Sequence, residues 1–169
     1  MARKKVAIIV GSDSDWPAME GCYKTLREFG VPTEVQVLSA HRTPDKLASF
    51  VQGADERGIG VFIAGAGMAA ALPGAVAACT ALPVIGVPLV SGALQGVDSL
   101  LSIVQMPPGV PVATVGVGEA GARNAALLAV QILATADPLL AEAFKKHKRN
   151  QVESVDRKNQ SLQERLARE

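Results

Sequence analysis

Short apolar runs alternate with segments of helical periodicity along most of the chain. The apolar runs are continuous, which is typical of parallel strands covered on both faces. The predicted strands are residues 6–10, 33–38, 61–64, 83–87 and 112–117. The predicted helices are residues 18–29, 44–57, 75–80, 97–104 and 121–134, followed by a helix that begins at residue 137. This alternation predicts a parallel sheet with right-handed crossovers and helices on both faces.

The expected fold class is therefore α/β, a three-layer αβα sandwich of flavodoxin-like or Rossmann-like type. A length of 169 residues favours a single domain. We expect residues 1–136 to form the sandwich. Residues 137–169 form a charged helical tail that belongs to the same domain or to an oligomer interface. Either Ser14 or Asp15 is expected to cap the first helix, and Pro73 to interrupt or open the third.

The charge is unevenly distributed, although the net charge is only +1. Residues 1–144 carry 9 Lys/Arg and 12 Asp/Glu, which gives −3, and residues 145–169 carry 8 and 4, which gives +4. Because the tail mixes both signs, it predicts a solvated helix and no nucleic-acid partner. No apolar run is long enough to span a membrane. Two cysteines without a C-x-x-C motif indicate free thiols and a cytoplasmic location.

Segment 121–134 is apolar on most of its circumference, and so is the region 68–80. A helix that is apolar on all sides must be buried on all sides, which a small domain cannot do for its outer helices. We therefore expect a homo-oligomer in which these segments and the turn 106–111 contact other subunits.

Three loops, residues 11–17, 39–44 and 65–74, follow the first three predicted strands. The carboxyl ends of parallel strands share one edge, so these loops are expected to converge on one cleft. Hydroxyls, a helix N-terminus and an arginine together favour a phosphate site. The candidates are Ser12, Asp13, Ser14 and Asp15 in the first loop, Ser39, His41, Arg42 and Thr43 in the second, and the backbone of the third. Helix capping is an equally good explanation for each of these residues taken singly: Ser14, Asp15, Ser39, Thr43 or Asp45.

His41 is one of two histidines, and the other, His147, lies in the charged tail. Histidine is the side chain best suited to acid–base chemistry near neutral pH. A position on a loop beside Arg42 favours a functional role for His41 over a purely structural one.

Other classes of chemistry have little support. Gly65, Gly67 and Ala70 match G-x-G-x-x-A, but the acidic residue expected after the next strand is missing, which argues against a nicotinamide oxidoreductase. Two distant histidines and no carboxylate cluster beyond Asp13 and Asp15 provide too few metal ligands. No G-x-S-x-G or Walker A motif is present. We therefore expect neither a metal nor a cofactor.

Six motifs, in order and without gaps over about residues 5–135, together resemble one family. They are G-S-D-S-D-W-P, S-A-H-R-T-P-D, A-G-A-G followed by L-P-G, L-P-V-I-G-V-P, D-S-L-L-S-I-V-Q-M-P and N-A-A-L-L-A-x-Q-I-L. The family is the N5-carboxyaminoimidazole ribonucleotide mutases of purine (IMP) biosynthesis. The resemblance implies a flavodoxin-like sandwich assembled as a homo-octamer. It also implies an isomerase that moves a carboxylate from the exocyclic nitrogen to C4 of the imidazole ring without ATP, metal or biotin.

The resemblance also implies roles for individual residues. Ser12, Asp15 and Arg42 fall where the family binds the phosphate and ribose of the ribonucleotide, and Ser39 joins the phosphate site. His41 falls on the acid–base histidine. The residues that hold the ring and the migrating carboxylate are Gly65, Ala66 and Gly67.

Two positions depart from the mutase pattern, which reads A-G-A-G-G-A-A-H-L-P-G. This chain has Met68 and Ala71 where that pattern has glycine and histidine. A related carboxylase branch, which uses aminoimidazole ribonucleotide and free CO2, also lacks that histidine but has lysine at the position of Arg42. Arg42 therefore favours the mutase. The carboxylase and a non-catalytic, flavodoxin-like nucleotide-binding module remain as alternatives.

Overall fold

A parallel five-stranded sheet forms the centre of the molecule in the computed structural model, which describes residues 3–168. The strand order is β2-β1-β3-β4-β5, the order of flavodoxin-like sheets. The strands are β1 Lys5–Val10, β2 Thr33–Val37, β3 Ile59–Ala66, β4 Val84–Pro88 and β5 Ala113–Thr114. The helices are a 3-10 turn η1 Asp13–Asp15, then α1 Trp16–Glu28, α2 Pro44–Gln52, α3 Leu72–Ala77, α4 Val97–Val104, α5 Gly118–Ala134 and α6 Pro138–Leu166. The predicted three-layer α/β fold is confirmed.

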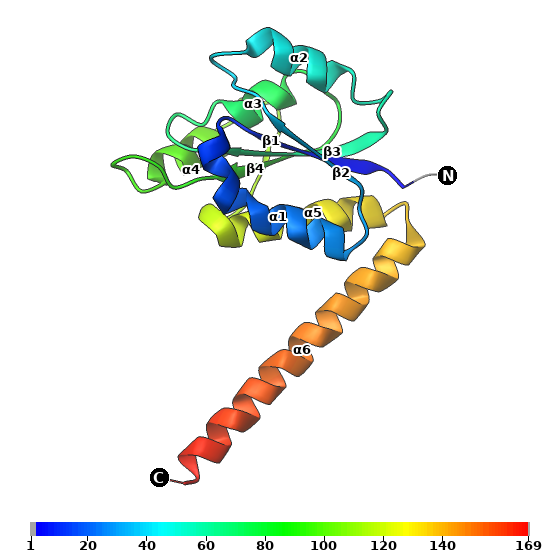
Figure 1. The fold of residues 1–169 in the computed structure, drawn as a ribbon, viewed down its shortest axis with the longest axis vertical. Coiled ribbons are helices and arrows are strands. Elements are labelled where there is room, and N and C mark those ends of the chain that lie inside the picture. The colour runs from blue at the N-terminus through cyan, green and yellow to red at the C-terminus, as the bar shows by residue number, and fades with distance from the viewer. Residues whose placement is uncertain (1–2, 169) are drawn as a thin grey trace.

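Helices cover both faces of the sheet, with α1 and α5 on one face and α2, α3 and α4 on the other (Figure 1). Alternate side chains of β1 serve the two cores: Val6 and Ile8 pack with α1 and α5, whereas Ala7 and Ile9 pack with α2 and α3. The strands are thus buried on both sides, which explains why their sequences are continuous apolar runs.

The register of the sheet aligns the ends of its strands. Val10 lies level with Val37 on one side and with Gly65 on the other, and Ala66 lies level with Pro88. The loops after β1, β2, β3 and β4 therefore start from one edge of the sheet.

Two predicted elements were too long. The helix predicted at 44–57 ends at Gln52, and Arg57 folds back so that its guanidinium carbon lies 4.2 Å from the centre of the Phe50 ring. The strand predicted at 112–117 pairs with β4 only through Ala113 and Thr114. β5 is an edge strand with β4 as its one neighbour, so within residues 3–168 its outer side has no strand with which to form further hydrogen bonds.

The apolar helix α5 is buried within the chain itself. It packs against α1, β3, β4 and α6, and its small residues, such as Ala125 and Ala129, are fully buried. Other subunits are therefore not needed to cover α5. The expectation that this apolar helix contacts other subunits, which was drawn from its sequence pattern, does not follow. Exposed apolar side chains collect instead on α4 and the loop before it, at Val90, Leu94, Val97, Leu101 and Val104.

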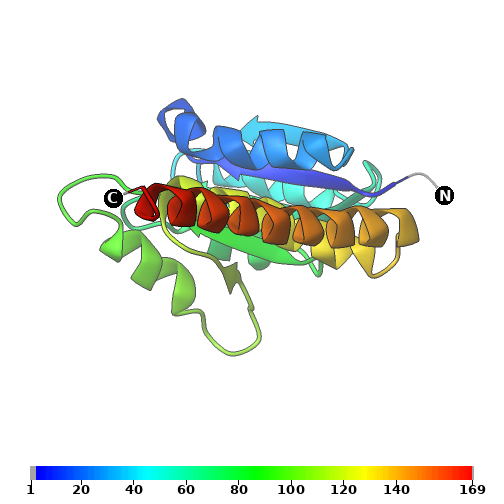
Figure 2. The ribbon, with the colours of Figure 1, turned by 90° about the horizontal axis from the view of Figure 1, so that it is seen from below.

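The tail is a single long helix, α6, that extends away from the sandwich (Figures 1 and 2). Asp137 caps it by accepting a hydrogen bond from the Leu140 N–H at 3.1 Å, and Arg3 donates to the same carboxylate at 2.8 Å. Leu140 is buried and Phe144 packs against Phe29, whereas nearly every residue after position 147 is exposed. Among residues 3–168 no helix is both long and apolar enough to cross a membrane.

Candidate active site

A cavity of about 440 Å³ lies at the edge of the sheet where the strands end. All three predicted loops contribute to its lining, and a fourth loop, after β4, adds Ser91. The lining residues are Gly11, Ser12, Ser14, Asp15, Ser39, Ala40, His41, Arg42, Ala66, Gly67, Met68, Ala69, Ala70, Ala71, Leu72 and Ser91.

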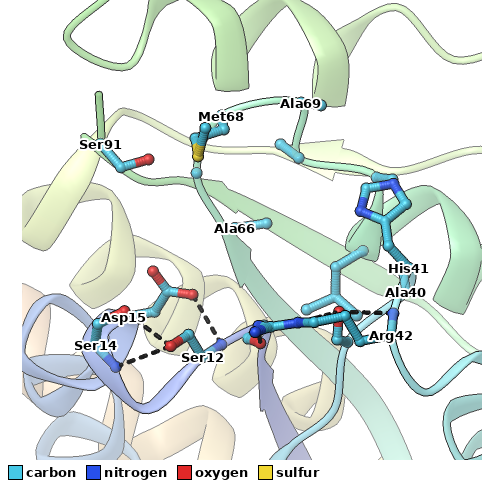
Figure 3. A pocket seen from close by; sticks show the side chains of 16 residues that line it. Ser12, Ser14, Asp15, Ala40, His41, Arg42, Ala66, Met68, Ala69 and Ser91 are labelled. Atoms are coloured by element: carbon cyan, nitrogen blue, oxygen red, sulfur yellow. Dashed lines mark hydrogen bonds between the residues drawn. The ribbon is translucent and has the colours of Figure 1, made fainter. Parts of the chain in front are cut away.

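The first loop is held by a reciprocal cap. The Ser12 N–H donates to Asp15 Oδ2 at 3.1 Å, and the Ser14 N–H donates to Ser12 Oγ at 3.3 Å (Figure 3). Ser12 therefore caps η1. As expected, Asp15 occupies the N-cap position of α1, but its side chain makes no capping hydrogen bond to that helix and accepts from the Ser12 N–H instead. The three-residue turn η1 separates the cap from α1, and the sequence pattern did not reveal it.

Asp15 is partly buried beside the cavity. Burial raises the pKa of its carboxyl above the ordinary value of 3.8, although hydrogen bonds from the backbone of Ser12 and Gly11 and the charge of Arg42 oppose the shift. A desolvated carboxylate is a strong hydrogen-bond acceptor, so this group is suited to hydroxyl donors on a ligand.

Arg42 joins the first two loops. Its Nη2 donates to the Gly11 carbonyl at 3.0 Å, and its Nε lies 3.4 Å from Ser39 Oγ. The Arg42 backbone N–H also donates to Ser39 Oγ, at 3.2 Å. Ser39 and Arg42 are thus hydrogen-bonded to one another, and the Arg42 guanidinium extends from the second loop towards Ser12 on the first (Figure 3).

His41 lies on the second loop between Ala40 and Arg42, with its side chain exposed at the cavity wall. Figure 3 shows its ring standing apart from Ser12, Ser14 and Asp15, on the side of the cavity that faces Ala69. An anion held by Arg42 and the serine hydroxyls would therefore leave the imidazole free to contact another part of the same ligand.

The third loop is tightly folded. Ala66 and Gly67 line the cavity, but Gly65 does not, because it packs against the core, where an added Cβ would lie 2.8 Å from the Met19 sulfur. Met68 and Ala70 have positive φ angles of 54° and 40°, a conformation that is uncommon for residues other than glycine. Pro73 lies in the first turn of α3, so it opens this helix.

Ser91 is the lining residue that sequence reasoning missed. It follows β4, and only the loops after the first three strands were considered. The signal was available, since all loops that follow parallel strands reach the same edge of the sheet. No group of three or more His, Cys, Asp or Glu side chains suited to a metal ion occurs within residues 3–168.

The fold and this cavity define a flavodoxin-like α/β protein with a cavity at the carboxyl ends of its strands that is lined by an arginine, a histidine and serine hydroxyls. A family model described as AIR carboxylase matches residues 5–154. The chain belongs to this AIR carboxylase family.

Curated relatives cover nearly the whole chain. A protein of Mycobacterium tuberculosis named N5-carboxyaminoimidazole ribonucleotide mutase is 55% identical over 170 residues, which is 99% of this chain and 97% of the relative. Proteins with the same name are 59% identical in Pyrococcus abyssi, over 85% of this chain and 82% of the relative, and 55% identical in Escherichia coli, over 89% of each.

Solved structures agree with the fold. The crystal structure of a Treponema denticola PurE2 variant superposes with a TM-score of 0.85 at 27% identity, covering 95% of this chain and 99% of that one. Treponema denticola PurE gives a TM-score of 0.84 at 28% identity, with the same coverage of each chain.

Proposed function

We propose that this chain is a mutase that converts N5-carboxyaminoimidazole ribonucleotide to 4-carboxy-5-aminoimidazole ribonucleotide in purine biosynthesis. The names of its relatives support the substrate class. The observation that carries the proposal is the cavity itself, where the only histidine outside the tail shares a wall with an arginine and a group of serine hydroxyls.

The substrate is held at two ends in this proposal. Arg42, Ser39 and Ser12 bind the phosphate, because a guanidinium and hydroxyls provide charge-assisted hydrogen bonds to its oxygens. Asp15 accepts hydrogen bonds from the ribose hydroxyls. Gly67 and Ala66 form the surface on which the ring and the carboxylate lie, while Gly65 supports that surface from the core.

The chemistry needs one proton shuttle. His41 donates a proton to the exocyclic nitrogen as the N–COO⁻ bond breaks, which leaves an amine and CO2. The C4 atom then bonds to the CO2 carbon, and His41 takes the proton that C4 loses, so the two half-reactions balance. Walls of alanine and glycine keep the CO2 beside the ring and exclude water.

The test is His41→Asn, assayed for turnover of the N5-carboxylated substrate. Loss of general acid–base catalysis lowers kcat by about 10²- to 10⁴-fold. His147→Asn is the matched control, because His147 packs against Phe29 and Phe144 away from the cavity. Retention of more than about a tenth of wild-type turnover by His41→Asn would exclude the proton shuttle.

The second candidate is a carboxylase that takes aminoimidazole ribonucleotide and free CO2. The observation that favours it is Ala71, which lines the cavity where the mutase pattern has a histidine. Arg42, adjacent to His41, favours the mutase. The two candidates differ only in which substrate enters the same cavity.

The proposed enzyme is a cytoplasmic homo-octamer. The exposed apolar side chains of α4 support an oligomer, since exposed patches of this kind mark contact surfaces. Two free cysteines support a reducing compartment. Light scattering that gives a monomer at micromolar concentration would refute the oligomer.

A further inference from the structure

Ser91 is a polar side chain that lines the cavity, yet no protein group accounts for its hydroxyl. Its Oγ is shielded from solvent and has no hydrogen-bond partner among residues 3–168. It lies three positions beyond Pro88, the last residue of β4, so it reaches the same sheet edge as the loops that carry His41 and Arg42.

Ser99, the next serine along the chain, shows how a buried structural hydroxyl is paired. Ser99, in the first turn of α4, is fully buried, and its hydroxyl has two carbonyl acceptors for its single hydrogen, Leu89 O at 2.9 Å and Gly96 O at 3.0 Å. Buried hydroxyls are normally paired in this way. Ser91, eight residues earlier, has no such partner, and it is Ser91 that faces the cavity.

The position of Ser91 depends on Gly67. A Cβ added to Gly67 would lie 2.1 Å from Ser91 Oγ and 3.0 Å from Ser91 Cβ, so a side chain at this position would displace the Ser91 hydroxyl. Ser91 and Gly67 therefore lie side by side in the lining of the cavity. Figure 3 shows Ser91 on the same side of the cavity as Met68.

We propose that Ser91 is a further substrate-binding residue, whose hydroxyl donates a hydrogen bond to the carboxylate that is transferred. The inference rests on the proposed function. It assigns a hydrogen-bond donor of the protein to the carboxylate that migrates in the proposed reaction. The proposed phosphate end of the cavity already has Arg42, Ser12 and Ser39. Figure 3 shows Ser12 and Arg42 below Ser91, at a different part of the cavity.

The chemistry of the transferred group suits a neutral donor. The group is an anion on the nitrogen, neutral as CO2, and an anion again on C4. A guanidinium would stabilise the two anionic ground states most, and uniform ground-state binding does not accelerate the step. A hydroxyl can hydrogen-bond to the oxygens throughout. The only charged residue between Gly58 and Gly118 is Asp98, so this side of the cavity lacks a cationic side chain.

The experiment compares two ligands that differ only in the carboxylate: 5-aminoimidazole ribonucleotide and its 4-carboxylated form. Their dissociation constants are measured by calorimetry in a full-length chain that carries His41→Asn, so that neither ligand is consumed, with and without Ser91→Ala. Ser102→Ala is the matched control, because Ser102 is exposed on α4 and does not line the cavity.

Ser91→Ala is expected to weaken binding of the carboxylated ligand about tenfold and binding of the other ligand less than about twofold. Equal weakening of both ligands, or no change in either, would overturn the proposal. The melting temperature should not fall, because the variant removes a hydroxyl without a partner, whereas Ser99→Ala should lower it. A fall with Ser91→Ala would show a structural role instead.

Turnover separates this proposal from the proposed function. In a chain with intact His41, Ser91→Ala should increase the share of N5-carboxylated substrate released as uncarboxylated amine and CO2. If the wild-type chain converts no such substrate, the proposed function fails, yet the ratio of the two dissociation constants still decides whether Ser91 contacts a carboxylate.

Discussion

Arg42→Lys tests the phosphate end of the cavity while preserving the positive charge. In the structure one guanidinium bridges two loops, through Nη2 to the Gly11 carbonyl at 3.0 Å and through Nε to Ser39 Oγ at 3.4 Å. Arginine has five N–H donors, so three remain beyond these two contacts with described residues. Lysine has a single nitrogen and cannot bridge the loops and bind an anion with a planar fork.

The magnitude follows from the bonds that are lost. A hydrogen bond to a charged group contributes about 1.5–3 kcal/mol, which corresponds to about 10- to 150-fold in binding. The phosphate does not react, so its binding is equal in the ground state and the transition state. The loss should therefore appear in KM, with kcat within about twofold of wild type. The Arg42 side chain is exposed, so stability should change by less than about 1 kcal/mol.

The assay is the initial rate of product formation as a function of substrate concentration. Arg27→Lys is the matched control, because Arg27 is an exposed arginine on α1 that donates to the Tyr23 hydroxyl at 3.0 Å, outside the cavity. An unchanged KM in Arg42→Lys, or a loss confined to kcat, would refute the assignment of Arg42 to the phosphate.

Three further predictions concern groups whose environment the structure defines. Burial raises the pKa of the Asp15 carboxyl in the folded chain, so protonation of Asp15 stabilises the folded state. The stability of the wild-type chain should therefore fall as pH rises through a window above 3.8. In thermal melts at several pH values Asp15→Asn should not show this fall, and its KM should rise. In Gly121→Ala the new Cβ would lie 1.6 Å from the Gly116 carbonyl oxygen, so urea unfolding should show a loss of about 2–4 kcal/mol. Burial raises the pKa of the Cys22 thiol to about 12, so iodoacetamide should label Cys79 in the native protein and Cys22 only in urea.

The order of the elements could be predicted because each apolar run corresponds to a strand that is covered on both faces. The ends were harder to place. The segment 44–57 keeps a helical pattern up to Arg57, but the chain turns after Gln52 so that Arg57 can stack on Phe50 and pair with Glu34 at 3.2 Å. Such long-range contacts are absent from a local pattern. The same reason applies to α5, whose apolar faces are covered by α1 and by α6.

The convergence of the loops on one cavity was also predictable, because it follows from a parallel sheet. The details depended on contacts that only the fold creates. Ser12 and Asp15 share one cap, so the individual capping roles could not be separated by sequence. Gly65 looked equivalent to Gly67, yet the pleat points it towards Met19 in the core, while Gly67 faces the cavity and Ser91.

Turnover of two substrates, measured side by side on the wild-type chain, tests the central claim most directly. One is N5-carboxyaminoimidazole ribonucleotide without added bicarbonate, and the other is aminoimidazole ribonucleotide with saturating bicarbonate. The account predicts fast conversion of the first and slow conversion of the second at low CO2. The reverse result would contradict it, would assign the chain to carboxylation with free CO2, and would make Met68 and Ala71 the next residues to exchange.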